Sequence, residues 1–356
     1  MSDKFIVRSR FKNYEVAFSE DFIQSISSCV KDNDFLFIDK RVHELYMDRI
    51  NGLFKQDNII IIEANEQSKT LENSYKLITR LVENNIRRDN RLFAIGGGVM
   101  EDLTGFISSI IFRGIEWLFI PTTLLAQADS CIGSKTSINM DEYKNLLGTF
   151  YPPSHVFIDM NFLATLAEEE LKSGIGEILH FYLIAGKDKL ASEMMSNYEK
   201  LLKEPVMLKE YILQSLKIKK SVIEKDEFDK GIRNIFNYGH TFGHAIETVT
   251  SYAINHGQAV SMGMDIANHI SLSMGHITKN KFEYMHSILE KNIPAFSLTE
   301  ENLEAYFRAL SKDKKNIGKN VGCILTKGPG SMMRVQIPMA KNLKNFIRSY
   351  FNISEE

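Results

Sequence analysis

The sequence contains few of the features that mark secreted or polyanion-binding proteins. Only three cysteines occur among its 356 residues, Cys29, Cys131 and Cys323, and no two of them form a CxxC pair. This spacing argues against a disulfide framework and favours a reducing compartment. Lysine and arginine number 43 against 45 aspartates and glutamates, so the chain has no general positive field for a nucleic acid or an anionic membrane. We therefore expect neither as a partner.

Long apolar runs are also missing. No stretch approaches the roughly 18 residues that a membrane-spanning helix needs. The first residues, MSDKFIVRSRFKNYE, lack the apolar core of a secretory signal, and we expect a cytoplasmic protein. Hydrophobic residues make up 44% of the chain and charged residues 25%, which is typical of a folded globular protein.

The sequence falls into two halves of different pattern. Short β-rich runs recur in the first half: FLFID at 35–39, NIIIIEA from 58, RLFAI ending at Ile95, WLFIPTT from 117 and HVFIDM from 155. With helical stretches between them, such runs predict an α/β layer around a largely parallel, buried sheet. After about residue 165 amphipathic helical stretches dominate. We predict an α/β domain over residues 1–165 and a mostly α-helical domain over 166–356.

A glycine-rich turn follows one of the predicted strands. In AIGGGVMED, Gly96, Gly97 and Gly98 stand between an apolar run and an expected helix start. Glycines there let the backbone approach a ligand, and a helix N-terminus offers N–H groups to a phosphate. A tight turn without a ligand is an equal alternative, because Glu101 stands where the GxGxxG fingerprint has its third glycine. Polar side chains that would face the same crevice follow the next strand: Thr122, Thr123 and Asp129.

Three histidines lie close together in the second half. In NIFNYGHTFGHAIE, His240 and His244 are four residues apart and share one helical face, with Glu247 one turn further on, and His256 follows in HG. Such a pair presents two imidazoles to one metal, or one to a metal and the other to a substrate. A lone histidine on an apolar helix is usually a core residue, but this clustering favours a site. Glu177, in the apolar segment SGIGEILH, is a candidate third ligand because a buried carboxylate needs a cation nearby.

The motifs described above belong to a longer series of segments, each of which occurs once. In chain order they are GGGVMEDLTGF, FRG, PTTLLAQADSCIGSKT, KNLLGTFYPP, SGIGEILH, DEFDKGIRNIFNYGHTFGHAIE, HGQAVSMGM and SKDKKN. In this order and spacing they resemble 3-dehydroquinate synthase and the wider sugar phosphate cyclase family. The likeness covers nearly the whole chain. It implies that residues 1–165 are an NAD-binding α/β domain. Residues 166–356 would then be a helical domain that binds substrate and a divalent metal, usually zinc with cobalt as an alternative, in a homodimer.

The resemblance also implies a role for individual residues. The metal ligands would be Glu177, His240 and His256, while His244 resembles the family histidine that contacts substrate phosphate and assists proton transfer. NAD contacts would come from Gly97, Gly98, Asp102, Thr122, Thr123, Glu66 and Lys69. Substrate contacts would come from Asp129, Lys135, Asn145, Lys219, Arg233 and Asn237, with Arg113 supplied across the dimer and Lys314 or Lys315 closing the phosphate site.

The implied reaction is that of a phosphate-eliminating carbon–oxygen lyase of the shikimate pathway, which leads to the aromatic amino acids. It cyclises a small phosphorylated sugar acid, 3-deoxy-D-arabino-heptulosonate 7-phosphate, to 3-dehydroquinate. NAD takes a hydride from a secondary alcohol that the metal polarises, phosphate leaves, and NADH returns the hydride before the ring closes. NAD is therefore recycled. Several lysine and arginine donors suit such an anionic substrate.

The chain departs from the family pattern at four positions: His180, where lysine is usual, Asp229 and Gln258, where glutamate is common, and Glu101 in the glycine loop. At His180 a permanent ammonium is replaced by an imidazole that titrates near pH 6.5. Lys219, Arg233 and Asn237 are present together, which favours the carboxylate-bearing substrate.

Three alternative functions remain open. The first is a cyclase acting on another heptulose or hexose phosphate. The second is a metal-dependent alcohol or glycerol dehydrogenase, which would accumulate NADH where a cyclase would not. The third is a non-catalytic NAD-binding homologue, suggested by His180 and Glu101, which would bind NAD without releasing phosphate from any sugar phosphate.

Overall fold

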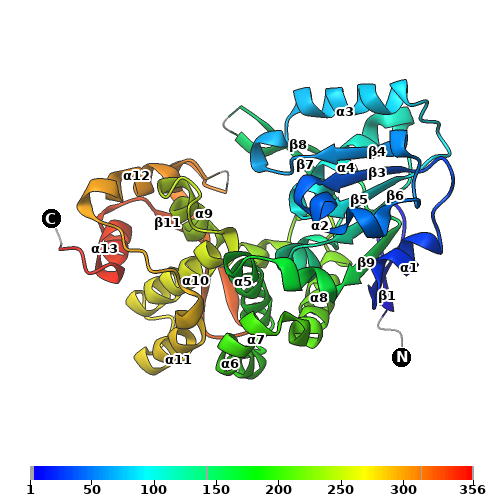
Figure 1. Cartoon of the computed structure of the whole chain (residues 1–356). Coiled ribbons are helices and arrows are strands. Elements are labelled where there is room, and N and C mark those ends of the chain that lie inside the picture. Colours follow the sequence, from blue (N-terminus) through cyan, green and yellow to red (C-terminus); the bar gives the residue numbers. More distant parts are fainter. Residues whose placement is uncertain (1–3, 142, 314, 355–356) are drawn as a thin grey trace. The chain divides into compact units, whose positions relative to one another are not determined.

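The computed structural model describes residues 4–141, 143–313 and 315–354 (Figure 1). The chain forms two compact units. The first runs to Leu166 and includes Lys220–Phe228, and the second comprises Ala167–Lys219 and Asp229–Glu356. The chain thus passes from the second unit back to the first within a single helix, α8 (Lys209–Ile223).

The first unit is built on a seven-stranded sheet in the order β1-β2-β9-β6-β5-β3-β4. Its strands are β1 (Lys4–Val7), β2 (Tyr14–Ser19), β3 (Phe35–Asp39), β4 (Ile59–Ile62), β5 (Leu92–Gly96), β6 (Trp117–Pro121) and β9 (His155–Asp159). All neighbours are parallel except β1 and β2. The five predicted runs are β3, β4, β5, β6 and β9, so the predicted α/β class with a largely parallel sheet is confirmed.

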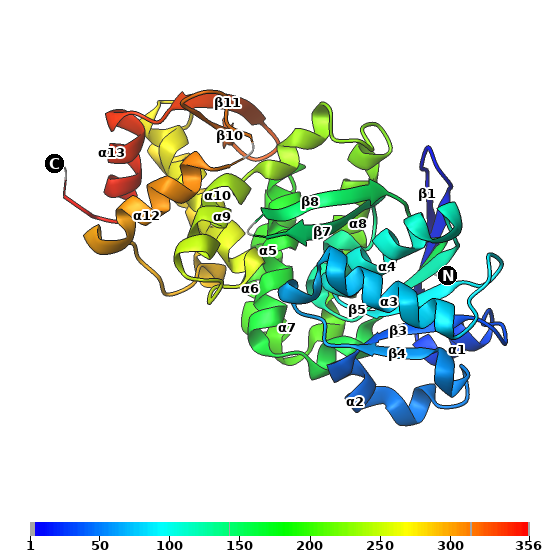
Figure 2. The same ribbon diagram turned by 90° about the horizontal axis from the view of Figure 1, so that it is seen from above.

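Helices cover both faces of this sheet (Figure 1, Figure 2). They are α1 (Phe22–Ser27), α2 (Lys40–Ile50), α3 (Leu71–Glu83) and α4 (Gly98–Ile110). Leu36 and Ile38 of β3 belong to one buried cluster with Phe22 of α1 and Val42 of α2. Because side chains alternate along a strand, Phe37 points to the opposite face, and α3 and α4 cover that face, as right-handed crossovers require. A hairpin of β7 (Lys135–Met140) and β8 (Tyr143–Phe150) packs against α4.

The second unit is mostly helical, as predicted. Besides most of α8 it contains α5 (Glu168–Ile184), α6 (Asp188–Ser196), α7 (Tyr198–Lys203), α9 (His240–Val249), α10 (His256–Ser273), α11 (Lys279–Leu289), α12 (Glu300–Ser311) and α13 (Lys341–Tyr350). A hairpin of β10 (Asn320–Thr326) and β11 (Met332–Pro338) was not predicted. No helix in the described part of the chain is both long enough and apolar enough to cross a membrane.

Glycines bring three helices of the second unit into backbone contact. A Cβ added to Gly176 of α5 would collide with the carbonyl of Gly257 in α10, and one on Gly257 would collide with the carbonyl of Ser173. In the same way Gly243 of α9 lies against Ala259 of α10. Since only glycine permits such an approach, the first turn of α10 is held tightly between α5 and α9. The residues next to these glycines form the site described below.

Candidate functional site

The second unit brings a glutamate and two histidines together from three different helices. Glu177 lies in the middle of α5, while His240 and His256 are the first residues of α9 and α10. Oε1 of Glu177 is 3.5 Å from Nε2 of His240 and 3.2 Å from Nε2 of His256. One ligand atom from each residue lies within 4.8 Å of the others. These are the three residues for which the sequence predicted metal ligation.

Both imidazoles are oriented by acceptors on their far sides. Nδ1 of His240 lies 3.2 Å from the carbonyl oxygen of Tyr238, and Nδ1 of His256 lies 3.3 Å from Oε2 of Glu247. Because a carbonyl or carboxylate oxygen only accepts, each Nδ1 carries a proton, and each Nε2 is the nitrogen that would give its lone pair to a metal, in place of any proton there. The sequence analysis did not predict these outer partners, although the HxxxHxxE spacing had placed Glu247 on the same helix.

The cluster fits a divalent metal ion. Two lone pairs and a carboxylate oxygen converge on one point, and Oε1 of Glu177 has no hydrogen-bond partner among the described residues. Ligand atoms at roughly 2.0–2.2 Å from a tetrahedral zinc lie about 3.3–3.6 Å from one another, close to the 3.5 and 3.2 Å separations observed here. Three protein ligands also leave one position for a substrate oxygen, as catalytic zinc sites do.

The pKa values of these groups reflect burial and their mutual charges. Burial opposes the charged form of Glu177, but His240 and His256 outweigh it and hold the pKa of this carboxyl below its usual value. Burial lowers the pKa of His240 to about 3. The pKa of His256 is raised well above its usual value despite burial, because the carboxylates of Glu177 and Glu247 lie on either side of its ring. An ionised Glu177 beside a neutral His240 is the state that a cation requires of its ligands.

His180 lies against the ligand carboxylate. It is one turn after Glu177 on α5, is 1% exposed, and its Nδ1 is 3.4 Å from Oε2 of Glu177. Its ring lies 4.8 Å from that of His240. The imidazole that replaces the usual family lysine therefore contacts the oxygen of Glu177 that does not face His240 and His256.

His244 lies beside the cluster and is more accessible. Its side chain is 47% exposed, and its Nε2 is 4.0 Å from Oε2 of Glu247. Desolvation beside the cluster is the main cause of its lowered pKa, and His240, His256 and Lys315 add to the shift. Lys315 pairs with Asp313 at 2.8 Å. The other candidate for closing the phosphate site, Lys314, lies outside the described residues.

The remaining residues of the second unit that were predicted to bind substrate are buried or half-buried. Lys219 on α8 is 6% exposed, and Arg233, in the 3-10 turn Ile232–Asn237, is 8% exposed. Asn237 donates a hydrogen bond to the carbonyl of Asn234. Scattered lysines and arginines normally lie in solvent, so the burial of Lys219 and Arg233 distinguishes them from surface charges.

In the first unit the glycine turn lies at the carboxyl edge of the sheet. Gly97 is the N-cap of α4, and a Cβ on it would lie 3.1 Å from Cγ2 of Thr123. The backbone N–H of Thr122 donates to the carbonyl of Gly96, so the ends of β5 and β6 are joined side by side. Gly98 begins the helix. A strand end, a side-chain-free cap and a helix N-terminus form the arrangement that binds a dinucleotide phosphate.

A buried ammonium group lies next to this turn. Nζ of Lys69 is 2.7 Å from Oδ2 of Asp102, 2.8 Å from Oδ1 of Asn145 and 3.7 Å from Oε1 of Glu66. Burial raises the pKa of Asp102, although the charge of Lys69 opposes the shift. Asn145 was predicted to contact substrate, but here it accepts a hydrogen bond from Lys69. It therefore belongs to the same cluster as Lys69, Asp102 and Glu66, which were predicted to contact NAD.

The other predicted site residues of this unit lie in turns or at the start of a strand. Asp129 is in a single π-helical turn, Ala126–Ser130, and Lys135 begins β7. Arg113 follows α4 with a left-handed φ of 67°, directly after Phe112 with a φ of 51°. The carboxylate of Glu101 accepts a hydrogen bond from Ser130, an interaction that sequence spacing did not predict.

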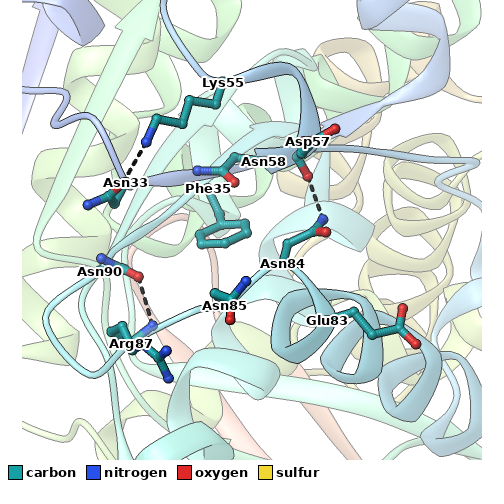
Figure 3. Close-up of a pocket in the computed structure, with 10 residues that line it drawn as sticks. All are labelled: Asn33, Phe35, Lys55, Asp57, Asn58, Glu83, Asn84, Asn85, Arg87 and Asn90. Atoms are coloured by element: carbon teal, nitrogen blue, oxygen red, sulfur yellow. Dashed lines mark hydrogen bonds between the residues drawn. The ribbon is translucent and has the colours of Figure 1, made fainter.

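A separate cavity of about 560 Å³ lies at the opposite edge of the sheet (Figure 3). It is next to the beginnings of β3 and β4 and contains several asparagines. Asn84 donates to the carbonyl of Asp57, and Asn90 accepts from the backbone of Arg87. These side chains stabilise local turns. Because ligands of parallel sheets bind beyond the carboxyl ends of the strands, the glycine turn remains the candidate nucleotide site.

Comparisons with known proteins identify relatives along most of the chain. The family model described as 3-dehydroquinate synthase N-terminal matches residues 59–173, and the model described as 3-dehydroquinate synthase C-terminal matches residues 174–316. A curated 3-dehydroquinate synthase from Clostridium tetani is 39% identical over 296 residues, which cover 82% of this chain and 79% of the relative.

Solved structures of sugar phosphate cyclases share the fold. A 2-deoxy-scyllo-inosose synthase complexed with carbaglucose-6-phosphate, NAD+ and Co2+ superposes with a TM-score of 0.83 at 27% identity, covering 97% of this chain and 99% of that one. The 2-epi-5-epi-valiolone synthase of Streptomyces hygroscopicus, with NAD+ and Zn2+ bound, has a TM-score of 0.83 at 22% identity, covering 97% and 98%. The second likeness is one of fold alone.

Proposed function

The chain belongs to the 3-dehydroquinate synthase family, and we propose that it converts 3-deoxy-D-arabino-heptulosonate 7-phosphate to 3-dehydroquinate and phosphate. This is an elimination of phosphate followed by ring closure, and hence the reaction of a carbon–oxygen lyase. Curated 3-dehydroquinate synthases with 32–39% identity over most of the chain support the proposal. The 2-deoxy-scyllo-inosose synthase with NAD+ and Co2+ in its structure supports NAD and a divalent metal as the cofactors here.

We propose specific holders for both cofactors. Glu177, His240 and His256 would hold a divalent metal, with zinc as the first choice and cobalt as the alternative. Gly97, Gly98, Thr122 and Thr123 would hold the NAD pyrophosphate, and Lys69, Asp102 and Glu66 would contact the rest of the nucleotide. When bound, the metal supplies Lewis acidity toward a substrate oxygen, and NAD supplies reversible hydride transfer without net consumption.

The other side chains would bind the anionic substrate and move its protons. Lys219 and Arg233 are buried cations that would bind its carboxylate and phosphate, together with Asn237, Asp129 and Lys135. His244, with an accessible ring beside the metal ligands, would hold or release a proton near the phosphate. Lys315 would close the phosphate site, since its charge already acts on His244. Donors arranged in advance stabilise charge on the leaving group.

One observation supports this proposal most strongly. The lone pairs of His240 and His256 and an oxygen of the buried Glu177 meet at separations that fit one tetrahedral ion. The Nδ1 atoms on the far sides are bound to Tyr238 and Glu247, so Nε2 of each ring is the nitrogen left to bind an ion. This set of ligand atoms supports a metal site.

The decisive experiment measures phosphate release from the heptulosonate phosphate with catalytic NAD and added zinc. The proposal predicts many turnovers for each NAD bound, formation of 3-dehydroquinate, and no accumulation of NADH. Net NADH formation from glycerol or another alcohol would support a dehydrogenase instead. NAD binding without phosphate release from any sugar phosphate would support a non-catalytic homologue.

A cyclase for a different sugar phosphate is the second candidate, and His180 favours it. The buried imidazole lies at 3.4 Å from Glu177, at the position where related 3-dehydroquinate synthases are expected to have lysine. A panel of heptulose and hexose phosphates separates the two candidates. His180→Lys sharpens the result, because a large gain in activity toward the heptulosonate phosphate would indicate that the native substrate is another sugar phosphate.

We further propose that the enzyme acts as a homodimer in the cytoplasm, with Arg113 reaching the substrate phosphate of the partner subunit. Ile110 and Phe112, next to Arg113, are 43% and 38% exposed, and exposed apolar residues beside a strained turn suit a subunit contact. Sedimentation of the purified protein tests the dimer. A monomer with full activity at nanomolar concentration would exclude the shared site.

A further inference from the structure

The geometry points to Glu247 as a positioning residue that holds the metal ligand His256 in its binding orientation and couples it to His244. This inference rests on the proposed metal centre. Glu247 is the eighth residue of α9, and its side chain is 12% exposed. A carboxylate this buried is costly unless it is paired.

The contact with His256 selects the tautomer of that ring. Oε2 of Glu247 lies 3.3 Å from Nδ1 of His256, while Nε2 of the same ring faces Glu177 at 3.2 Å. By accepting the Nδ1 proton, Glu247 leaves the Nε2 lone pair directed at the cluster. The negative charge also makes the imidazole a stronger donor to a metal.

The same carboxylate oxygen lies close to a second imidazole. Oε2 of Glu247 is 4.0 Å from Nε2 of His244, one turn earlier on α9. The rings of His244 and His256 are nearly parallel, with centroids 5.7 Å apart and an interplanar angle of 29°. A single side chain thus contacts both the metal ligand and the histidine proposed for proton transfer.

The backbone of Glu247 also stabilises the loop that leads to His256. Its carbonyl oxygen accepts hydrogen bonds from the backbone N–H of Tyr252 at 2.8 Å and from Oγ1 of Thr250 at 3.3 Å. Within this loop Ser251 and Tyr252 have φ values of 50° and 62°, which are left-handed conformations that cost energy for residues other than glycine. Glu247 therefore holds both the strained loop, through its backbone, and the imidazole at its end, through its side chain.

His240 provides an internal contrast. Its outer partner is the neutral carbonyl of Tyr238, which no substitution of that side chain removes. His256 depends on a charged side chain that can be replaced. Loss of Glu247 is therefore expected to affect one of the two imidazole ligands and to leave the other unchanged.

The test is a titration of the chelator-treated protein with Co2+, followed by its visible absorption, and a competition with Zn2+. Four proteins are compared: wild type, Glu247→Ala, Glu247→Gln and the control Glu301→Gln, which removes a charge from an exposed position of α12. We expect Glu247→Ala to bind Co2+ about 10–100-fold more weakly and with an altered spectrum. Glu247→Gln should lie between it and wild type, because the amide oxygen still accepts the Nδ1 proton. The control should match wild type.

Turnover at saturating metal provides a second readout. A lower kcat with an unchanged KM for the sugar phosphate is expected for Glu247→Gln, since the inference gives this residue a contact with His256 and His244 and none with the substrate. Wild-type affinity and spectrum in Glu247→Ala would overturn the inference while the metal centre remained. If the wild-type protein itself bound neither Co2+ nor Zn2+, the proposed metal centre would fail, and the inference with it. Thermal unfolding of the metal-free proteins shows whether each variant is folded, and the nearly isosteric Glu247→Gln is informative even if Glu247→Ala is not folded.

Discussion

The two units each contain a buried charged group, and they neutralise it in different ways. In the first unit the ammonium of Lys69 meets Asp102, Glu66 and Asn145, all within the chain. In the second, the carboxylate of Glu177 meets only imidazoles among the described residues. The first cluster is formed by folding alone, whereas we propose that the second also binds a cation.

The largest effect is expected from His240→Ala, which removes one of the three proposed metal ligands. We expect turnover to fall to background and zinc affinity to fall by more than the roughly 10–100-fold typical of outer partners. The free energy of unfolding of the metal-free protein should change by only about 1 kcal/mol. Phosphate release, bound zinc by elemental analysis and urea unfolding with a chelator measure the three quantities. Undiminished activity would refute the assignment of His240 as a ligand.

Lys69→Met tests the buried charge cluster of the first unit. The substitution leaves Asp102 without its cation, and we expect a loss of about 2 kcal/mol of unfolding free energy, less than for a fully buried pair because Asp102 is partly exposed. The loss should be the same with and without zinc. Adding Asp102→Asn to this variant should restore part of the stability. A loss that appears only in the presence of zinc would contradict the proposed difference between the units.

His180→Leu examines the side of Glu177 that faces away from His240 and His256. We expect zinc affinity to fall about tenfold, at the lower end of the range for outer partners, because Nδ1 of His180 lies at 3.4 Å and Oε2 of Glu177 is not itself the converging oxygen. Competition between the protein and a zinc-binding dye measures the change. Unchanged affinity would show that Glu177 is held by helix packing alone.

The smallest expected effect is a change in how the stability depends on pH. It concerns His286, an imidazole that is hydrogen-bonded to the buried Asp265. The hydrogen bond to Asp265 at 2.8 Å raises the pKa of His286. Tyr350 donates to the same carboxylate, and Glu290 adds a further negative charge. A raised folded-state pKa stabilises the fold below the ordinary histidine pKa near 6.5, and this contribution is lost as pH rises through the folded-state value.

Because the His286 side chain is 43% exposed, we expect less than about 1 kcal/mol from this pair. His286→Gln should reduce the fall in unfolding free energy between pH 6 and pH 8. Urea unfolding of both proteins at several pH values measures the slope. An identical slope in the variant would show that His286 does not contribute.

Much of the first unit was predictable because its strands are buried on both faces. β3, β5 and β6 are continuous apolar runs, and such runs need no tertiary information to be found. β1, an edge strand of four residues, and its neighbour β2 were not predicted, and neither were the hairpins β7–β8 and β10–β11, which lie outside the seven-stranded sheet. The segment Lys220–Phe228 also belongs to the first unit. The predicted single boundary near residue 165 therefore does not separate the two units completely.

In the candidate site, too, some features were predictable from the sequence and others were not. The HxxxH spacing placed His240 and His244 on one helical face but left open whether both bind metal. The structure places His240 beside Glu177, while Nε2 of His244 lies 4.0 Å from Oε2 of Glu247. Composition gave no reason to single out Lys219 and Arg233, which only the family resemblance named, and the structure buries both.

The sequence by itself determined the residue types, the helical and strand periods and the motif order from which the family and the reaction class follow. These are local properties, because side-chain chemistry and hydrophobic spacing act over a few residues. Only the tertiary structure decided which atoms converge. Glu177, His240 and His256 come from three helices that glycine contacts hold together, and the tautomer of each imidazole depends on an acceptor whose position is fixed by packing.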